Sequence, residues 1–321
     1  MFRAVAGLAA VLVILPGGGI VGTASAQQRT VVVLGTATPG GGFPVYGAAV
    51  AETINDTDPT LSVEPRNTKG STENVPLLEA GRLDIALVQG EVVHESLTGV
   101  GRPPASLKIL AATYSTPGMF VVRADSPYRT IADLRGKPVA FGARGSGLVI
   151  LARYVLDGLG LDQARDFQAV YLERAGDGPA MVLDGRVAAL WGGGLGWPGF
   201  AAVAKAPGGA RFLAPDADGI AKILGKHAFL KPMSVPAGAY PGLDAPLASV
   251  GSWSFIMARE NLPDDVAYRL ARALHRGEAA LGRRLPQARE TTAANTAAGA
   301  PRRELLHPGV QRYLREIGLV P

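Results

Sequence analysis

The sequence predicts an α/β fold made of two units in which short strands alternate with helices. First, short apolar runs such as residues 31–34 alternate with segments of helical periodicity, which is typical of α/β proteins. Second, this pattern restarts after residues 134–138, so a second unit follows the first. Third, a chain of 321 residues is long enough for about two domains, at roughly 150 residues each.

The first unit begins with a predicted strand at residues 31–34, a glycine-rich loop at 35–42 and a helix at 43–54. A later helix is predicted at 74–80, and we start it at Asn74 because Pro76 then stands at its second position, where a missing N–H costs little. Ser71 and Thr72 then belong to the preceding loop. The other predicted strands of this unit are residues 61–64, 84–89, 107–113 and 119–123.

The second unit repeats the order strand, glycine loop and helix, at residues 139–141, 142–147 and 149–159. A loop at 192–197 then leads into a helix that opens at Pro198, a position where proline is well tolerated. The tail at 286–300 is small and polar and receives no assignment. The remaining predicted elements are strands at 170–172, 187–191 and 252–257 and helices at 179–183 and 264–281, with a proline-rich stretch at 232–246.

The first 26 residues have the pattern of a cleaved secretory signal peptide. Arg3 precedes an apolar run at residues 4–15, and Ala24-Ser25-Ala26 supplies the small-x-small cleavage site. An uncleaved anchor is the alternative, but 12 helical residues reach about 18 Å, short of the roughly 30 Å hydrocarbon layer. The chain has no Cys for a lipid anchor. We therefore predict a freely diffusing exported protein, retained in a bacterial periplasm.

Composition argues against several classes of function. The absence of Cys excludes disulfides, zinc-thiolate sites and thiol nucleophiles. A net charge of +5 without a Lys/Arg run, together with 6% aromatic residues, does not indicate a nucleic-acid partner. No two of the four histidines have metal-ligand spacing and G-x-S-x-G is missing, so we expect no metal, no cofactor and no catalytic residues.

A dinucleotide site is the alternative interpretation of the first glycine loop. The loop follows a strand, and Glu64 lies where a ribose-binding acid is found. Its sequence Gly-Thr-Ala-Thr-Pro-Gly-Gly-Gly does not have the G-x-G-x-x-G spacing, however, so we reject this interpretation.

The order strand, glycine-bearing loop and helix start occurs three times, at residues 35–43, 142–148 and 192–198. Helix N-termini carry unpaired N–H groups and partial positive charge, and such loops meet at the carboxyl ends of the strands. We therefore predict an anion-binding cleft. Arg144 in the second loop is a candidate carboxylate ligand, and Trp191 and Trp197 flank the third loop as candidate pocket walls.

The mature chain resembles the TAXI-type solute-binding proteins of tripartite ATP-independent periplasmic (TRAP) transporters over nearly its whole length. The resemblance rests on motifs in a fixed order. In chain order these are Gly35-Thr36 with its loop to Tyr46, Lys69-Gly70-Ser71-Thr72-Glu73-Asn74, Leu77-Leu78, Gly81-Arg82-Leu83-Asp84-Ile85-Ala86-Leu87-Val88-Gln89, Val121-Val122-Arg123-Ala124-Asp125-Ser126, Asp133-Leu134-Arg135-Gly136-Lys137, Gly145-Ser146-Gly147, Pro236-Ala237-Gly238-Ala239-Tyr240-Pro241-Gly242 and His307-Pro308-Gly309.

This resemblance implies a two-lobed periplasmic binding protein fold (type II-like) with the ligand cleft between the lobes. One lobe would comprise residues 27–118 and 231–321, and the other residues 119–230. The lobes would close on a small organic carboxylate and deliver it to a TRAP-type membrane permease, the protein itself being monomeric. By position, the resemblance implies as ligand-binding residues Thr36, Tyr46, Ser71, Asn74, Gln89, Ser146, Gly147 and the loop at 192–196 with Gly194.

Two departures from the family pattern bear on the solute. Leu148 stands where the family usually has Thr, and Trp191 and Trp197 make the third loop more aromatic. They suggest a carboxylate with a larger or aromatic body. Two other functions stay open at this point: a secreted α/β enzyme acting on a small carboxylate, and a ligand-binding partner of a membrane sensor.

Overall fold

The computed structural model describes Met1 and residues 29–321. The predicted signal peptide falls on residues 1–26 and so, apart from Met1, lies outside the described residues. Within the described part of the chain, no helix is both long enough and apolar enough to cross a membrane.

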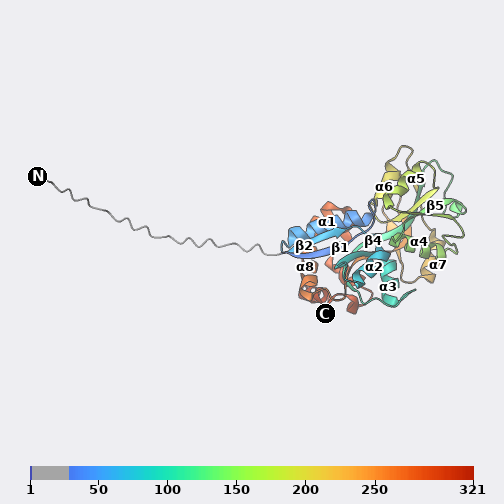
Figure 1. The fold of residues 1–321 in the computed structure, drawn as a ribbon. Helices are drawn as coiled ribbons and strands as arrows, with labels where there is room; N and C mark the ends of the chain where they lie inside the picture. The colour runs from blue at the N-terminus through green and yellow to red at the C-terminus, as the bar shows by residue number, and fades with distance from the viewer. Residues whose placement is uncertain (2–28) are drawn as a thin grey trace.

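The two units form two lobes that share one sheet (Figure 1). Its strands are ordered β2-β1-β3-β10-β4-β7-β5-β6, with β8 paired to β4 and β9 to β10. The α/β prediction is therefore confirmed. The strand bounds are β1 Thr30–Gly35, β2 Leu61–Arg66, β3 Ile85–Gln89, β4 Lys108–Arg123, β5 Pro138–Ala143, β6 Gln168–Leu172, β7 Ala189–Gly193, β8 Ala210–Leu213, β9 Lys231–Val235 and β10 Leu247–Ala258.

Helices cover both lobes. Figure 1 shows α1, α2, α3 and α8 around β1 and β2 and α4 to α7 around β5, with β4 running between. The helix bounds are α1 Gly42–Thr57, α2 Ser71–Glu79, α3 Gly90–Thr98, α4 Gly147–Gly158, α5 Gly178–Leu183, α6 Pro198–Lys205, α7 Ala217–Lys226, α8 Asp264–Arg284, α9 Ala293–Gly299 and α10 Pro308–Glu316.

Strands β4 and β10 connect the lobes. We predicted two strands at 107–113 and 119–123, but β4 is one strand of 16 residues that continues through Pro117 and Gly118. Gly251 of β10 lies opposite Pro117, and a Cβ on it would lie 2.0 Å from the carbonyl oxygen of Thr116, so only glycine fits there. Strand β4 pairs with β10 before this point and with β7 and β8 beyond it.

The hydrophobic cores show how the chain divides. One core joins side chains of β1, β3, α1 and α8, and two adjoining cores fill the other lobe. Val235, Tyr240, Leu243 and Val250 belong to the cores of the second lobe, although they follow the boundary that we expected at residue 231. We therefore propose that the chain returns to the first lobe inside β10, near Gly251.

Helix α2 begins earlier than predicted. It starts at Ser71, so Pro76 lies inside it and cannot donate to the carbonyl of Thr72. The early start is supported from outside the helix: the carbonyl of Gly70 accepts from the N–H groups of Glu73 and Asn74, at 3.0 and 2.9 Å. The side chain of Glu73 in turn accepts from the N–H of Lys69 at 2.5 Å. These bonds offset the one that Pro76 removes, and they place Ser71 on the helix.

Candidate ligand-binding site

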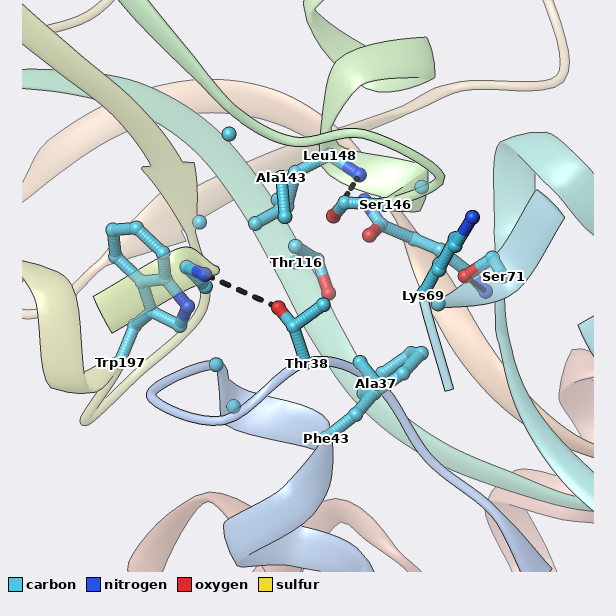
Figure 2. Close-up of a pocket in the computed structure, with 18 of the residues that line it drawn as sticks. Ala37, Thr38, Phe43, Lys69, Ser71, Thr116, Ala143, Ser146, Leu148 and Trp197 are labelled. Carbon is cyan, nitrogen blue, oxygen red and sulfur yellow. Dashed lines mark hydrogen bonds between the residues drawn. The ribbon is translucent and has the colours of Figure 1, made fainter. Parts of the chain in front are cut away.

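A cavity of about 50 Å³ lies between the two lobes, where β3, β4, β5 and β7 end or cross. Figure 2 shows residues of both lobes facing it. The lining residues are Ala37, Thr38, Gly41, Gly42, Phe43, Lys69, Gly70, Ser71, Gln89, Tyr114, Thr116, Gly142, Ala143, Ser146, Gly147, Leu148, Leu172, Ala175, Gly193 and Trp197.

Five helices begin at this cavity. Gly42, Ser71 and Gly147 are the first residues of α1, α2 and α4, and Gln89 and Trp197 are the residues that precede α3 and α6. All five line the cavity. Because each helix N-terminus carries a partial positive charge and unpaired N–H groups, their convergence makes the cavity favourable for an anion.

Lys69, Ser71, Gln89, Ser146 and Gly147 form what we call the polar end of the cavity. The Ser71 hydroxyl oxygen accepts from the N–H of Gln89 at 3.1 Å, and that of Ser146 accepts from Leu148 at 3.2 Å. Each hydroxyl hydrogen therefore remains available to a ligand. A Cβ on Gly147 would lie 2.9 Å from Ser71 Oγ and 3.0 Å from Gln89 Oε1, so only glycine lets the two lobes meet here.

Lys69 is the one charged side chain among the described residues that line the cavity. It lies beside Ser71 and Ser146 (Figure 2), and within the described part of the chain it forms no ion pair. Its ammonium group adds a full positive charge to the helix N-termini. No acidic side chain of residues 29–321 lines the cavity to oppose it.

Gly42, Tyr114 and Trp197 form what we call the aromatic end. Both aromatic side chains are more than nine-tenths buried, at 6% and 5% exposure. Burial raises the pKa of Tyr114 far above its ordinary value, so its hydroxyl stays protonated. This end therefore offers neutral groups, in contrast to the polar end.

The two lobes are in direct contact around the cavity. The Ala175 N–H donates to the hydroxyl of Thr38 at 3.1 Å, as the dashed line in Figure 2 marks, and the Gly176 N–H donates to the carbonyl of Pro39 at 3.3 Å. On another side, Glu95 of α3 accepts from Tyr154 of α4 at 2.8 Å and pairs with Arg153. The structure is thus a closed arrangement of the lobes.

The structure brings five of the predicted site residues to the cavity: Ser71, Gln89, Ser146, Gly147 and Trp197, the last of which we expected as a pocket wall. Three others lie one layer behind it and connect elements of the first lobe. Asn74 donates to the carbonyls of Thr36 and Leu87 at 2.9 and 2.8 Å, and Thr36 donates to the carbonyl of Arg66.

Tyr46 is the third residue of this layer, and its hydroxyl bonds Thr291 at 2.8 Å. Burial raises its pKa far above the ordinary value. Like Thr36 and Asn74, it is not among the residues that line the cavity.

The remaining three predicted residues lie outside the cavity. Trp191 is fully buried in the core of the second lobe, where its indole N–H donates to the carbonyl of Leu148 at 2.8 Å. Arg144 points to solvent, with its side chain 67% exposed and 3.8 Å from Glu173. The carbonyl of Gly194 accepts from the hydroxyl of Tyr240 at 2.6 Å, and its neighbour Gly193 lines the cavity in its place.

Sequence reasoning missed Thr38, Tyr114 and Thr116. Thr38 stands inside the first glycine loop, so its place in the sequence could have identified it as a candidate site residue. Tyr114 and Thr116 lie in the middle of β4, and the prediction of a break before residue 119 hid the fact that this stretch forms the cavity floor.

The four histidines have structural partners away from the cavity. His94 stacks on Phe229, with ring centroids 4.0 Å apart, and His227 bonds Asp157 at 2.7 Å. His275 bonds Tyr313, and His307 accepts from the N–H of Gly309 at the start of α10. No cluster of three potential metal-ligating side chains occurs among residues 29–321.

Comparison with known proteins gives a family match and a set of similar structures. The model described as "NMT1-like family" matches residues 34–318. A protein from Bordetella bronchiseptica RB50 superposes with a TM-score of 0.57 at 14% identity, covering 90% of this chain and 98% of that chain. A TctC solute binding protein from Polaromonas gives 0.51 at 17% identity, covering 92% and 100%.

The substrate binding protein of an amino acid ABC transporter gives a TM-score of 0.50 at 15% identity, covering 80% of this chain and 100% of that chain. These similarities confirm the predicted fold class, the two-lobed fold of periplasmic binding proteins.

Proposed function

Because the chain belongs to the NMT1-like family, whose model spans nearly all of the described residues, we propose that it is a periplasmic solute-binding protein. Its solute is a small organic carboxylate, captured by closure of the lobes and delivered to a membrane transporter. In this proposal the protein binds the solute without breaking any bond in it.

One observation carries the proposal: five helix N-termini and the Lys69 ammonium group converge on an inter-lobe cavity that no acidic side chain of the described chain lines. Fixed N–H groups and a positive charge stabilise a carboxylate without reorganisation. The hydroxyls of Ser71 and Ser146 supply further donors at the polar end, so we place the carboxylate there.

Closure of the lobes increases the affinity for the solute and also forms a surface that a membrane transporter can recognise. In the closed arrangement the solute is removed from water, which strengthens its hydrogen bonds to the cavity. A few charge-assisted bonds of about 1.5–3 kcal/mol each are enough for a micromolar dissociation constant, about −8 kcal/mol. Closure also creates a surface from both lobes, around Glu95 and Arg153, that the open form does not present.

The fold is shared with binding proteins of more than one transporter type, among them the TctC and amino acid ABC proteins above. We propose a TRAP-type permease as the partner, on the resemblance of the Gly145-Ser146-Gly147 and Lys69–Asn74 motifs to TAXI-type proteins. A signal peptide at residues 1–26, a periplasmic location and a monomeric state belong to the same proposal.

Protein purified without refolding, followed by mass spectrometry of the released small molecules, tests the proposal directly. We expect an acid that is recovered unchanged after incubation with the protein. Calorimetric titration with glutamate and with aromatic acids then tests the size of the solute body. Chemical conversion of the bound molecule, or a cationic or neutral solute, would contradict the proposal.

A further inference from the structure

The hydroxyl of Tyr114 is a hydrogen-bond donor with no acceptor in the described part of the chain. Its side chain is 6% exposed and lines the cavity, and its hydroxyl has no hydrogen-bond partner among residues 29–321. A phenol that is mostly buried normally has a hydrogen-bond partner, and the cavity is where a partner can reach this one. Tyr46, whose ring centroid lies only 4.9 Å away, follows that rule and bonds Thr291.

Trp197 presents a second unused donor. The side chain is 5% exposed, and its indole N–H likewise lacks a partner in the described part of the chain. The ring is fixed in place: a Cβ on Gly192 or Gly199 would lie 2.4 Å from it, and Phe200 packs edge-on at 4.8 Å. Figure 2 shows the indole nitrogen on the side of the ring that faces Thr38.

The two donors border the same space beside Gly42. A Cβ on Gly42 would lie 3.5 Å from Tyr114 Oη and 3.9 Å from Trp197 Nε1. The first N–H groups of α1 begin at the same place. Both side chains are uncharged, and the charged group of the lining, Lys69, lies beside Ser71 and Ser146.

We propose that the aromatic end is a second subsite, in which Tyr114 and Trp197 hold a neutral oxygen acceptor of the solute, such as a keto, amide or hydroxyl oxygen. The inference rests on the proposed function, since it assumes that the carboxylate occupies the polar end. The solute class is then an acid that carries an oxygen away from its carboxylate, and Tyr114 and Trp197 are the residues that select it.

Calorimetry on the full mature chain with a matched panel of acids tests this subsite. The panel pairs straight-chain monocarboxylates of three to six carbons with the acids of equal length that carry a terminal amide or hydroxyl. We expect the best oxygen-bearing acid to bind roughly 5- to 100-fold more tightly than its parent, the range that one or two buried hydrogen bonds supply. Tyr114→Phe should reduce this ratio toward one, whereas the matched control Tyr46→Phe should keep it.

Gly42→Ala is a second variant that leaves Tyr114 intact. Gly42 does not have a positive φ, so the backbone accepts the added methyl group. The methyl group would lie 3.2 Å from Trp197 Cδ1, a tight contact, and 3.5 Å from Tyr114 Oη, so it takes up the space beside the two donors. We expect it to reduce the same ratio.

The outcomes separate the two proposals. If parent acids bind but the oxygen gives no gain, or if Tyr114→Phe leaves the gain unchanged, the second subsite is wrong and the carboxylate-binding function stands. If no acid of the panel binds to the folded wild-type protein and the protein purified without refolding releases no acid, the proposed function fails, and the second subsite fails with it.

Discussion

The carbonyl oxygen of Gly145 accepts two hydrogen bonds from Thr72, one from its backbone N–H at 3.1 Å and one from its hydroxyl at 3.0 Å. Thr72 belongs to the first lobe and Gly145 to the second, so both bonds cross the mouth of the cavity. They can form only when the lobes are closed. The early start of α2 at Ser71 is what brings Thr72 into position.

Thr72→Val should therefore weaken solute binding, although Thr72 is not one of the residues that line the cavity. Loss of one hydroxyl bond of about 1 kcal/mol lowers the stability of the closed form and the affinity about fivefold. Isothermal titration calorimetry with the identified solute measures this. Thr98→Val is the matched control, because that hydroxyl bonds only to His94 within α3. Equal affinities for wild type and Thr72→Val would show that this bond does not contribute to closure.

Gly70→Ala should prevent complete closure. The Cβ would lie 2.9 Å from the carbonyl oxygen of Gly145 and 3.2 Å from Cα of Ser146, and the residue has a φ of +118°. Small-angle scattering with saturating solute should show an extended, open particle, and affinity should fall at least tenfold. Gly81→Ala is the control: it too has a positive φ, +66°, but no atom lies within 4 Å. Compaction of both variants alike on addition of solute would argue against this contact.

Lys69→Gln should reduce the affinity for an acid and also the sensitivity of that affinity to salt. The side chain is at the exposed rim of the cavity, so we expect a loss of about three- to tenfold at low ionic strength and a smaller loss at high salt. Titrations at two salt concentrations measure both effects. Lys205→Gln, an equal charge change on the exposed end of α6, should leave the affinity unchanged. The same salt dependence in wild type and Lys69→Gln would rule out a direct role for the ammonium group.

Glu91 predicts a pH dependence of stability. It is fully buried at the start of α3, and this burial raises its pKa from 4.5 to about 7. Below about pH 4.5 the carboxyl is protonated in both states and imposes no penalty. As pH rises from there to about 7, only the unfolded chain releases the proton, so stability falls, by about 3 kcal/mol in total, and is then constant.

Glu91→Gln tests that dependence because its amide is neutral at every pH. The variant and the wild type should unfold at similar temperatures at pH 4.5, and the variant should be the more stable one at pH 8. Thermal unfolding followed by circular dichroism measures the difference, and Glu64→Gln on the exposed end of β2 is the control. If the unfolding temperatures of variant and wild type differ by the same amount at pH 4.5 and pH 8, Glu91 is not the source of the pH dependence.

Local patterns predicted the elements that surround the cavity better than the residues that line it. The strand, loop and helix order located Ser146 and Gly147 because backbone geometry alone places a helix N-terminus at the end of its strand. The same pattern does not distinguish a side chain that lines the cavity from one that lies in the layer behind it. Asn74 differs from Ser71 by three positions on the same helix and is used to bond two carbonyls of the first lobe.

The features that the sequence did not predict depend on contacts between segments that are distant in sequence. Pro117 and Gly118 indicate a break when read locally, yet β4 continues because it pairs with β10 up to Pro117 and with β7 from Gly118 onward. Helices α3, α7, α9 and α10 and strands β8 and β9 were not predicted at all. Short elements of this kind are stabilised by the sheet and cores that they pack against.

The lobes are joined by two adjacent strands of a common ladder and not by free loops. Any rotation that admits a solute must therefore twist β4 and β10 together, and the hydrogen bonds between these strands limit its amplitude and oppose it elastically. The stiffness of this pair sets how often the empty protein samples its receptive form. Substitutions at Gly251 should thus alter the rate of solute uptake and release while every group that touches the solute remains unchanged.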